Sequence, residues 1–385
     1  MRVAFTRLHS QPSNGSAPPA VIGPLSGRIP SLDGLRAISV TLVILSHLVL
    51  NGFISISGPL RRLFFVGDLG VQVFFVISGF LITTLLLREL DTAGHIDLKA
   101  FYLRRTLRIW PPFYAYLAAL GVAVAAGALP AAGFWRSLLF ATTFTSNYLA
   151  PSVWSLEHTW SLAVEEQFYL LWPAVVVILG RLRALRSALI VVMLGPAIRF
   201  GELILGHRFP ALHERMGFSF ETACDSIAIG CVLAGFRTRL ASTAAYVRLL
   251  GSRYFIVVPL SVLAIEIFLV EGQHRLTYLT GLLVGHALQN VGIALSIDWC
   301  LRFPAGIVGR LLNSRPLVTV GLASYSIYLW QQLWLRPDSA MSTFSALVLV
   351  ASCAAGSYLL IERPMYRLRR RFEARPELEP AQASN

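Results

Sequence analysis

Long apolar segments with almost no charge dominate the chain, and this feature restricts its fold more than any other. A run of about 20 apolar residues can cross a bilayer as an α-helix, because helical backbone groups bond within their own segment. Ten segments have this character, and they cover approximately residues 34–53, 67–87, 111–130, 160–180, 186–206, 221–236, 254–271, 276–298, 317–335 and 341–361. We therefore predict about ten transmembrane helices.

The composition supports the same fold class. The 385 residues are 55% apolar and 14% charged, whereas soluble domains carry about 25% charged residues. The predicted fold is an all-α, polytopic membrane helix bundle. The cysteines Cys224, Cys231, Cys300 and Cys353 fall in or beside apolar segments and lack metal-site spacing, so the pattern indicates neither a disulfide framework nor a metal site.

The basic residues are distributed unevenly between alternate connections. The two ends of the chain and the connections on the same side hold 24 of the 33 lysines and arginines, whereas the opposite connections hold 7. The positive-inside rule then places both termini in the cytoplasm. This topology also accounts for the net charge of +13, so nucleic acid is not a predicted partner.

Three regions follow from these patterns. Residues 1–30 are polar, contain several prolines and lack an apolar signal core, which predicts a disordered cytosolic leader. Residues 31–362 form the predicted membrane domain, and residues 363–385 form a basic cytosolic tail suited to lipid headgroups. The aromatic segment 134–150 is predicted as an interfacial or re-entrant helix on the outer side.

Arg36 and His47 occur in one apolar segment, eleven residues apart. Eleven helical residues make about three turns, so both side chains leave nearly the same face, separated by about 16 Å along the axis. We expect the arginine at the cytosolic interface and the histidine near the middle of the membrane. An ionisable group at that depth is functional by default, although a structural core histidine stays the alternative.

Six stretches together resemble the integral membrane acyltransferase-3 family, and they occur in the family's order. They are LDGLRAISVTLVILSH, FFVISGFLIT, YLRRTLRIWPPFY, TWSLAVEEQFYLLWP, CDSIAIGCVLAG and SYSIYLW. The resemblance implies transfer of an acyl group, commonly acetyl, from cytosolic acyl-CoA to a hydroxyl of a cell-envelope or exported glycan. It also implies an enzyme of the bacterial inner (plasma) membrane that meets membrane lipid and a glycan or lipid-linked saccharide.

The resemblance assigns the donor site and the base. The family's arginine–histidine motif matches Arg36 and His47, and its paired-arginine motif matches Arg105 and Arg108. His47 is then the catalytic base, since imidazole titrates near neutrality. The three arginines would bind the donor, since guanidinium forks suit phosphate. Without the resemblance, the cluster Arg104 to Arg108 reads as a positive-inside anchor, and the following prolines are predicted to turn the chain into the membrane.

Glu165 is the second candidate catalytic residue. The family pattern aligns Trp160 and Ser161 beside it, and we expect these two residues in substrate binding. Glu165 could tune the histidine, orient the acceptor or bind its hydroxyls. The alternative is a carboxylate that only stabilises a helix N-terminus.

Two further residues are candidate substrate contacts. Asp33 precedes Arg36 by one turn and is placed either to pair with it or to cap the helix. Ser78 belongs to a Ser-Gly pair for which close helix packing is the first interpretation and a hydroxyl facing the thioester the second. No base for a covalent seryl intermediate is apparent, which favours direct transfer.

The remaining buried charges have less definite interpretations. Arg199 and Glu202 are expected to neutralise each other at a spacing of three residues. Glu266 and Asp298 have no predicted partner, and His158 is expected in an outer loop. Two places depart from the family pattern: Ala223 replaces an arginine, and Gln331-Gln332 stand where a histidine normally follows SYSIYLW.

The sequence thus predicts a membrane O-acetyltransferase that uses acetyl-CoA or another acyl-CoA and no metal. Succinyl or longer acyl groups stay open, as does a small secondary metabolite as acceptor. A rival interpretation from another class is a proton-coupled secondary transporter in which His47 and Glu165 relay protons.

Overall fold

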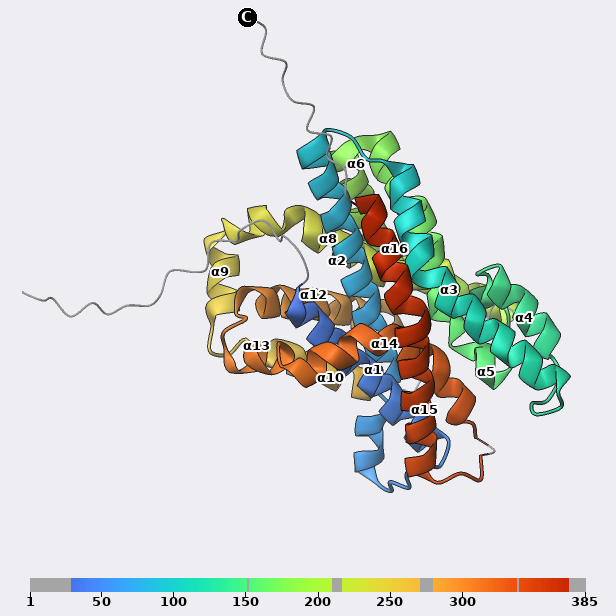
Figure 1. Cartoon of the computed structure of the whole chain (residues 1–385). Coiled ribbons are helices and arrows are strands. Elements are labelled where there is room, and N and C mark those ends of the chain that lie inside the picture. Colours follow the sequence, from blue (N-terminus) through green and yellow to red (C-terminus); the bar gives the residue numbers. More distant parts are fainter. Residues whose placement is uncertain (1–28, 151, 210–216, 271–279, 338, 374–385) are drawn as a thin grey trace, which may run out of the picture.

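Helices form every regular element that the computed structural model describes, in residues 29–150, 152–209, 217–270, 280–337 and 339–373. The all-α fold predicted from the apolar segments is confirmed for these ranges (Figure 1). In chain order the α-helices are α1 (Pro30–Leu50), α2 (Gly67–Ala93), α3 (Leu98–Ala125), α4 (Phe134–Thr142), α5 (Trp154–Glu157), α6 (Thr159–Arg208), α8 (Phe220–Ala241), α9 (Ala244–Gly251), α10 (Val257–Val270), α12 (His286–Arg302), α13 (Ile307–Leu312), α14 (Arg315–Trp334), α15 (Thr343–Ser357) and α16 (Arg363–Glu373). The 3-10 helices η1 (Pro59–Phe64) and η2 (Ser146–Tyr148) and the π-helices η3 (Gly281–Gly285) and η4 (Tyr358–Glu362) complete the set.

Helix α1 packs between α2 and α14 near the middle of the molecule (Figure 1). Pro30 occupies its first position, where the missing N–H costs no hydrogen bond. The backbone of Asp33 lies against Gly321, and further along His47 bonds Gln331, so α1 and α14 run parallel. This pairing places the two ends of the predicted arginine–histidine motif along one helix interface.

Glycines permit close crossing of α2 and α8. A Cβ atom on Gly79 would collide with the carbonyl of Ile227, and one on Gly230 would collide with the carbonyl of Val76. Small residues let membrane helices approach at such points. The packing interpretation of the Ser-Gly pair is therefore confirmed for Gly79.

Helix α6 contains two of the predicted segments, 160–180 and 186–206, joined at a single non-helical residue. Gly180 has φ 74° and ψ 164°, a conformation that a residue with a side chain would adopt only under strain. The two halves pack against α8 and, near Ser78, against α2.

Buried ion pairs connect several helices, and one of them corrects a prediction. Arg199 pairs with Asp225 at 2.6 Å, from α6 to α8, whereas Glu202 accepts a hydrogen bond from Ser219. The expected Arg199–Glu202 pair was therefore wrong, because the arginine extends to a neighbouring helix instead of along its own. The family pattern has an arginine at the position of Ala223, two residues before Asp225. In this chain the positive partner of Asp225 is Arg199.

The two carboxylates without a predicted partner also have partners. Asp298 pairs with Arg237 and Arg302 at 2.6 Å each, and Glu266 accepts a hydrogen bond from Gln289 at 2.7 Å. Both carboxylates are buried. Such groups are tolerated in a bundle interior only when they are paired or hydrogen-bonded.

Five helical segments of the described chain are long and apolar enough to cross a membrane: Pro30–Leu50, Arg61–Ala93, Leu98–Ala125, Trp154–Gly206 and Thr343–Leu368. Large apolar side chains on the outside, such as Ile178 at 77% exposed and Leu360 at 78%, fit a lipid environment. The count of ten spans and the orientation stay predictions, and the connection predicted between the seventh and eighth segments falls in residues 271–279, outside the described ranges.

Two boundaries differ from the sequence interpretation. Helix α3 begins at Leu98 and continues through Pro111 and Pro112, so these prolines do not start the helix. Helices α15 and α16 are joined through η4 into one long rod that packs against α3 (Figure 1). Helix therefore extends into the region expected to be only a basic tail.

Candidate functional site

A cavity of about 840 Å³ opens between α1, α2, α3, α6, α14 and the η4–α16 segment. Seven of the predicted site residues line it: Asp33, Arg36, Ser78, Arg105, Arg108, Ser161 and Glu165. These residues are far apart in the sequence and come from four helices. The bundle thus brings the predicted donor-binding arginines and the candidate carboxylate together.

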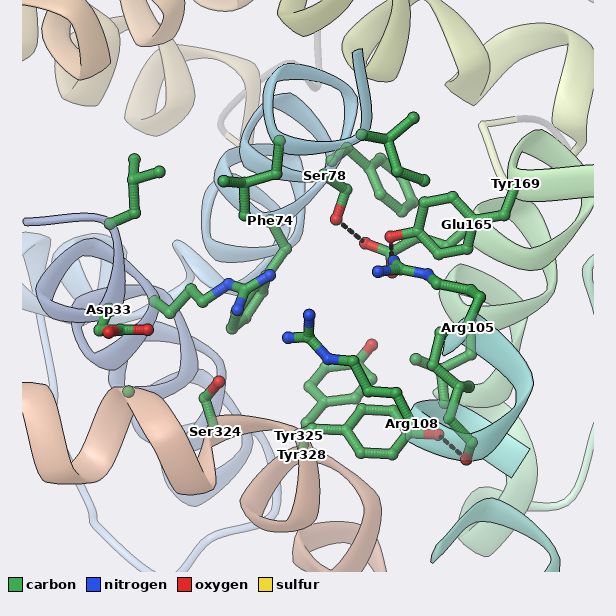
Figure 2. A pocket seen from close by; sticks show the side chains of 18 of the residues that line it. Asp33, Phe74, Ser78, Arg105, Arg108, Glu165, Tyr169, Ser324, Tyr325 and Tyr328 are labelled. Atoms are coloured by element: carbon green, nitrogen blue, oxygen red, sulfur yellow. Dashed lines mark hydrogen bonds between the residues drawn. The ribbon is translucent and has the colours of Figure 1, made fainter. Parts of the chain in front are cut away.

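The cationic side of the cavity belongs to α1 and α3. Arg105 and Arg108 are three residues apart on α3 and both enter the cavity, as Figure 2 shows, and Arg36 joins them from α1. None of these three arginines forms an ion pair within 4 Å with a carboxylate of the described chain. The Arg105 guanidinium lies 3.6 Å from the centre of the Tyr169 ring, and its buried Nε has no hydrogen-bond partner there.

The acidic side belongs to α6. Glu165 accepts hydrogen bonds from the Ser78 hydroxyl at 2.8 Å and the Tyr169 hydroxyl at 2.9 Å. Both bonds are drawn in Figure 2. Glu166 accepts a bond from the Trp110 indole at 3.1 Å and also lines the cavity. Neutral donors therefore hold both carboxylates, which leaves the guanidinium groups available for another anion.

Tyrosines form a part of the cavity that the sequence interpretation missed. Tyr325 and Tyr328 line it from α14, Tyr358 from η4 and Tyr366 from α16. Tyr325 and Tyr328 lie three residues apart within SYSIYLW, so their shared helix face was visible in the sequence. Tyr366 had no such signal, because its contribution depends on the continuation of the last helix.

Two predicted site residues do not line the cavity. Trp160 is half-buried and packs its ring edge-on against Phe75 and Phe218. His47 lies in the last turn of α1, three residues before its end at Leu50. Helix α1 begins and ends earlier than the predicted segment 34–53, and the depth of His47 in the membrane stays a prediction.

His47 lies outside the cavity lining and forms a hydrogen bond with α14. Its Nδ1 lies 2.6 Å from Gln331 Oε1, and its half-buried ring contacts Trp154 edge-on with centroids 5.1 Å apart. Gln331 and Gln332 follow SYSIYLW, where the family pattern predicts a histidine. The amide of Gln331 orients the His47 ring.

His158 also differs from its predicted place. It is buried at the start of α6, with Nδ1 2.6 Å from Gln332 Oε1, and is not in an exposed loop. The aromatic segment 134–150 forms α4 and η2, and α4 packs against α3. In the described part of the chain, no group of three or more His, Cys, Asp or Glu residues could hold a metal ion.

Most of the chain matches one known protein family. Residues 29–361 match the family described as "Acyltransferase domain" (acyltransferase-3). A Staphylococcus aureus (strain COL) protein named "Putative O-acetyltransferase SACOL0978" is 31% identical in an alignment of 323 residues that covers 78% of this chain and 50% of that protein. The O-acetyltransferase OatA of Staphylococcus aureus (strain NCTC 8325 / PS 47) is 29% identical over 321 residues, with the same coverage.

The chain thus spans about half the length of these relatives. No solved structure matches it. The family match includes every cavity-lining residue except Tyr366, both histidine–glutamine pairs and most of the described helices. The chain therefore belongs to the acyltransferase-3 family.

Proposed function

We propose that the chain is an integral membrane O-acyltransferase that moves an acetyl group from cytosolic acetyl-CoA to a hydroxyl of a cell-envelope or exported glycan. The observation that carries the proposal is the convergence on one cavity, beside Glu165, of three arginines that have no carboxylate partner among the described residues. The names of the relatives support acetyl as the group transferred.

The arginines suit the phosphates of the donor. Arg105 and Arg108 present two guanidinium groups from one face of α3, and Arg36 presents a third from α1. Planar guanidinium forks bind phosphate oxygens in pairs and stay charged at every physiological pH. The Glu165 carboxylate, held by Ser78 and Tyr169, would position the Tyr169 ring on which Arg105 rests.

The base acts at the far end of α1. His47 would take the proton of the acceptor hydroxyl while the oxygen of that hydroxyl attacks the thioester carbonyl. The carbon–sulfur bond then breaks, and the proton passes to the departing thiolate, which gives an ester and free CoA. Because His47 lies about 16 Å along the helix from Arg36 and outside the cavity lining, the acyl arm must extend past Ser161 and Tyr328.

The membrane arrangement follows from the charge distribution. The cavity includes Arg88, Arg105 and Tyr366, all of which lie in or beside predicted cytosolic connections. We therefore place the donor entrance on the cytosolic side of a bacterial inner membrane, with both termini inside. The acceptor, a glycan or lipid-linked saccharide, would approach the opposite end of α1.

The first test replaces the proposed base. Membranes with the wild-type chain should transfer labelled acetyl from acetyl-CoA to envelope glycans of the expressing bacterium, as ester released by mild alkali. His47→Ala should abolish this transfer at equal protein level, because the change removes the imidazole that is proposed to accept the proton at this end of α1. His95→Ala, on an exposed connection, is the matched control and should retain activity.

Undiminished transfer by His47→Ala would remove the mechanism. Accumulation of a solute by vesicles without acetyl-CoA consumption would favour a transporter instead. Transfer to a small soluble alcohol but not to glycans would keep the chemistry and change the acceptor class.

A further inference from the structure

A second histidine–glutamine pair lies beside the first. His47 Nδ1 is 2.6 Å from Gln331 Oε1, and His158 Nδ1 is 2.6 Å from Gln332 Oε1. Trp154 contacts both pairs, since its ring meets His47 and its indole N–H donates to the backbone carbonyl of Gln332 at 3.0 Å. These five residues are called the histidine cluster below.

The hydrogen bonds of Gln332 determine which ring nitrogen of His158 carries the proton. Gln332 Oε1 accepts the backbone N–H of His158 at 3.0 Å, and a backbone N–H can only donate. The amide atom facing the ring is therefore the oxygen, so Nδ1 must donate to it. In the neutral ring, Nε2 is then the unprotonated nitrogen with a free lone pair.

This lone pair has no partner within the described ranges, although His158 is only 2% exposed. Two donors on the last turn of α14 are in the same condition, namely the side-chain nitrogens of Gln331 and Trp334. Buried polar atoms normally have a hydrogen-bond partner. A hydroxyl group both donates and accepts, so it can satisfy an imidazole nitrogen and an amide at once.

The histidine cluster begins directly behind the wall of the donor cavity. The Tyr328 hydroxyl bonds the Ser161 hydroxyl at 2.7 Å and the His158 carbonyl at 3.3 Å, and both Tyr328 and Ser161 line the cavity. The Tyr328 ring also meets the His158 ring, with centroids 5.4 Å apart. A group bound at His158 would therefore be separated from the donor only by this layer.

We infer that His158 is a second histidine of the acceptor site, whose Nε2 accepts a hydrogen bond from a hydroxyl next to the one that is acylated. The inference rests on the proposed acyltransferase function and names its acceptor class: a saccharide or polyol with neighbouring hydroxyls. His47 removes the proton from the reacting hydroxyl, and His158 binds the adjacent one without exchanging a proton. Gln332 holds the His158 ring in the tautomer that leaves Nε2 able to accept.

The first test needs no acceptor. In detergent-solubilised protein labelled with ¹⁵N-histidine, His158→Gln identifies the ring signals of His158 by their loss. Nδ1 should then show the shift of a protonated nitrogen and Nε2 that of an unprotonated one, and Gln332→Leu should abolish this preference. A ring protonated at Nε2 in the wild-type protein overturns the inference.

The second test measures which hydroxyl His158 binds. Wild-type protein, His158→Gln and His286→Gln are assayed with acetyl-CoA, methyl glucoside and its monodeoxy analogues. His286 is the matched control because it also bonds a glutamine, Gln72 at 3.0 Å, but lies outside the histidine cluster. Loss of one hydrogen bond should raise the acceptor KM of His158→Gln about tenfold, with the acetyl-CoA KM unchanged.

With the wild-type protein, one deoxy analogue should show the same rise in acceptor KM as His158→Gln shows with methyl glucoside. With His158→Gln, this analogue should show no further rise. An acceptor KM equal in the wild type, His158→Gln and His286→Gln overturns the inference, even if both variants are less stable. Wild-type protein that acylates no acceptor overturns the proposed function as well, whereas active wild-type protein with an unaffected His158→Gln overturns the inference alone.

Discussion

At the scale of single residues, the cavity between α1, α3 and α6 is asymmetric. Glu165 and Glu166 accept hydrogen bonds from neutral donors, whereas Arg36, Arg105 and Arg108 have no carboxylate partner in the described chain. A guanidinium group without a carboxylate partner can bind an incoming phosphate without first breaking an ion pair. The asymmetry therefore favours a phosphorylated ligand on the α1–α3 side.

Replacing these cations should weaken donor binding specifically. We expect Arg105→Gln and Arg108→Gln each to raise the acetyl-CoA KM by about 10- to 100-fold, because each removes a charge-assisted bond to phosphate. The acceptor KM should stay unchanged. Steady-state kinetics measure both values, with Arg136→Gln on the exposed face of α4 as the control. Equal donor KM values in all variants would contradict phosphate binding at this site.

The sequence predicted the three arginines and Glu165 of the cavity but not the relation of the cavity to His47. The arginines, Glu165 and Ser78 stand in motifs whose helical spacing can be counted along the chain. The position of His47 depends on where α1 ends and on Gln331, which is 284 residues away. Contacts between distant segments leave no periodicity in the sequence, and for the same reason Tyr366 and the His158–Gln332 pair were missed.

At the scale of helices, α2 and α8 can cross closely because glycines, which have no side chain, stand at the contact points. A Cβ atom at Gly79 would meet the Ile227 carbonyl, which belongs to a helix backbone and cannot rotate away. Gly356 in α15 has no atom within 4 Å of the same position. The two glycines thus have opposite structural requirements although both lie in membrane helices.

Gly79→Ala should destabilise the protein, by about 1–3 kcal/mol as expected for overpacking. Gly356→Ala should be neutral or slightly stabilising, since alanine is favoured over glycine in a helix by about 1 kcal/mol. Thermal unfolding of the detergent-solubilised proteins measures the difference. A Tm for Gly79→Ala at or above that of Gly356→Ala would show that the helices do not cross this closely.

The ion pair between α6 and α8 shows the limit of reading helices one at a time. Spacing within α6 predicted that Arg199 pairs with Glu202, because residues three apart are neighbours on an isolated helix. The bundle instead offers Asp225, at 2.6 Å from Arg199 and almost without exposure. Apolar segments can be recognised singly, whereas the choice between two carboxylates depends on the packing of two helices.

Breaking this pair should be costly. Arg199→Leu leaves Asp225 buried without its charge partner, and we expect a loss of about 3–5 kcal/mol. Arg199→Leu/Asp225→Leu should recover a large part of that loss, because both charges are removed. Arg181→Leu breaks the exposed pair with Asp91 and should cost less than about 1 kcal/mol. A comparable Tm for Arg199→Leu and Arg181→Leu would contradict the buried pair.

At the scale of the whole molecule, the two proposed substrates approach opposite ends of α1. Arg36 lies near the start of this helix with the cavity, and His47 lies in its last turn with the histidine cluster. Parallel packing of α1 against α14 keeps the two ends in register, since α14 contributes Tyr328 to the cavity and Gln331 to His47. A transfer across the membrane therefore requires that these ends face different compartments.

Single cysteines test this orientation directly. We expect Ser55→Cys, after α1, to react with a membrane-impermeant maleimide in intact cells, because the positive-inside rule places this connection outside. Thr92→Cys, at the end of α2, should react only after the membrane is opened. Both positions are exposed, and the natural cysteines other than Cys353 are buried, so both variants are made in a Cys353→Ser background. The reverse labelling pattern would place the arginines away from cytosolic CoA, and a donor entering beside Arg36 would then be impossible.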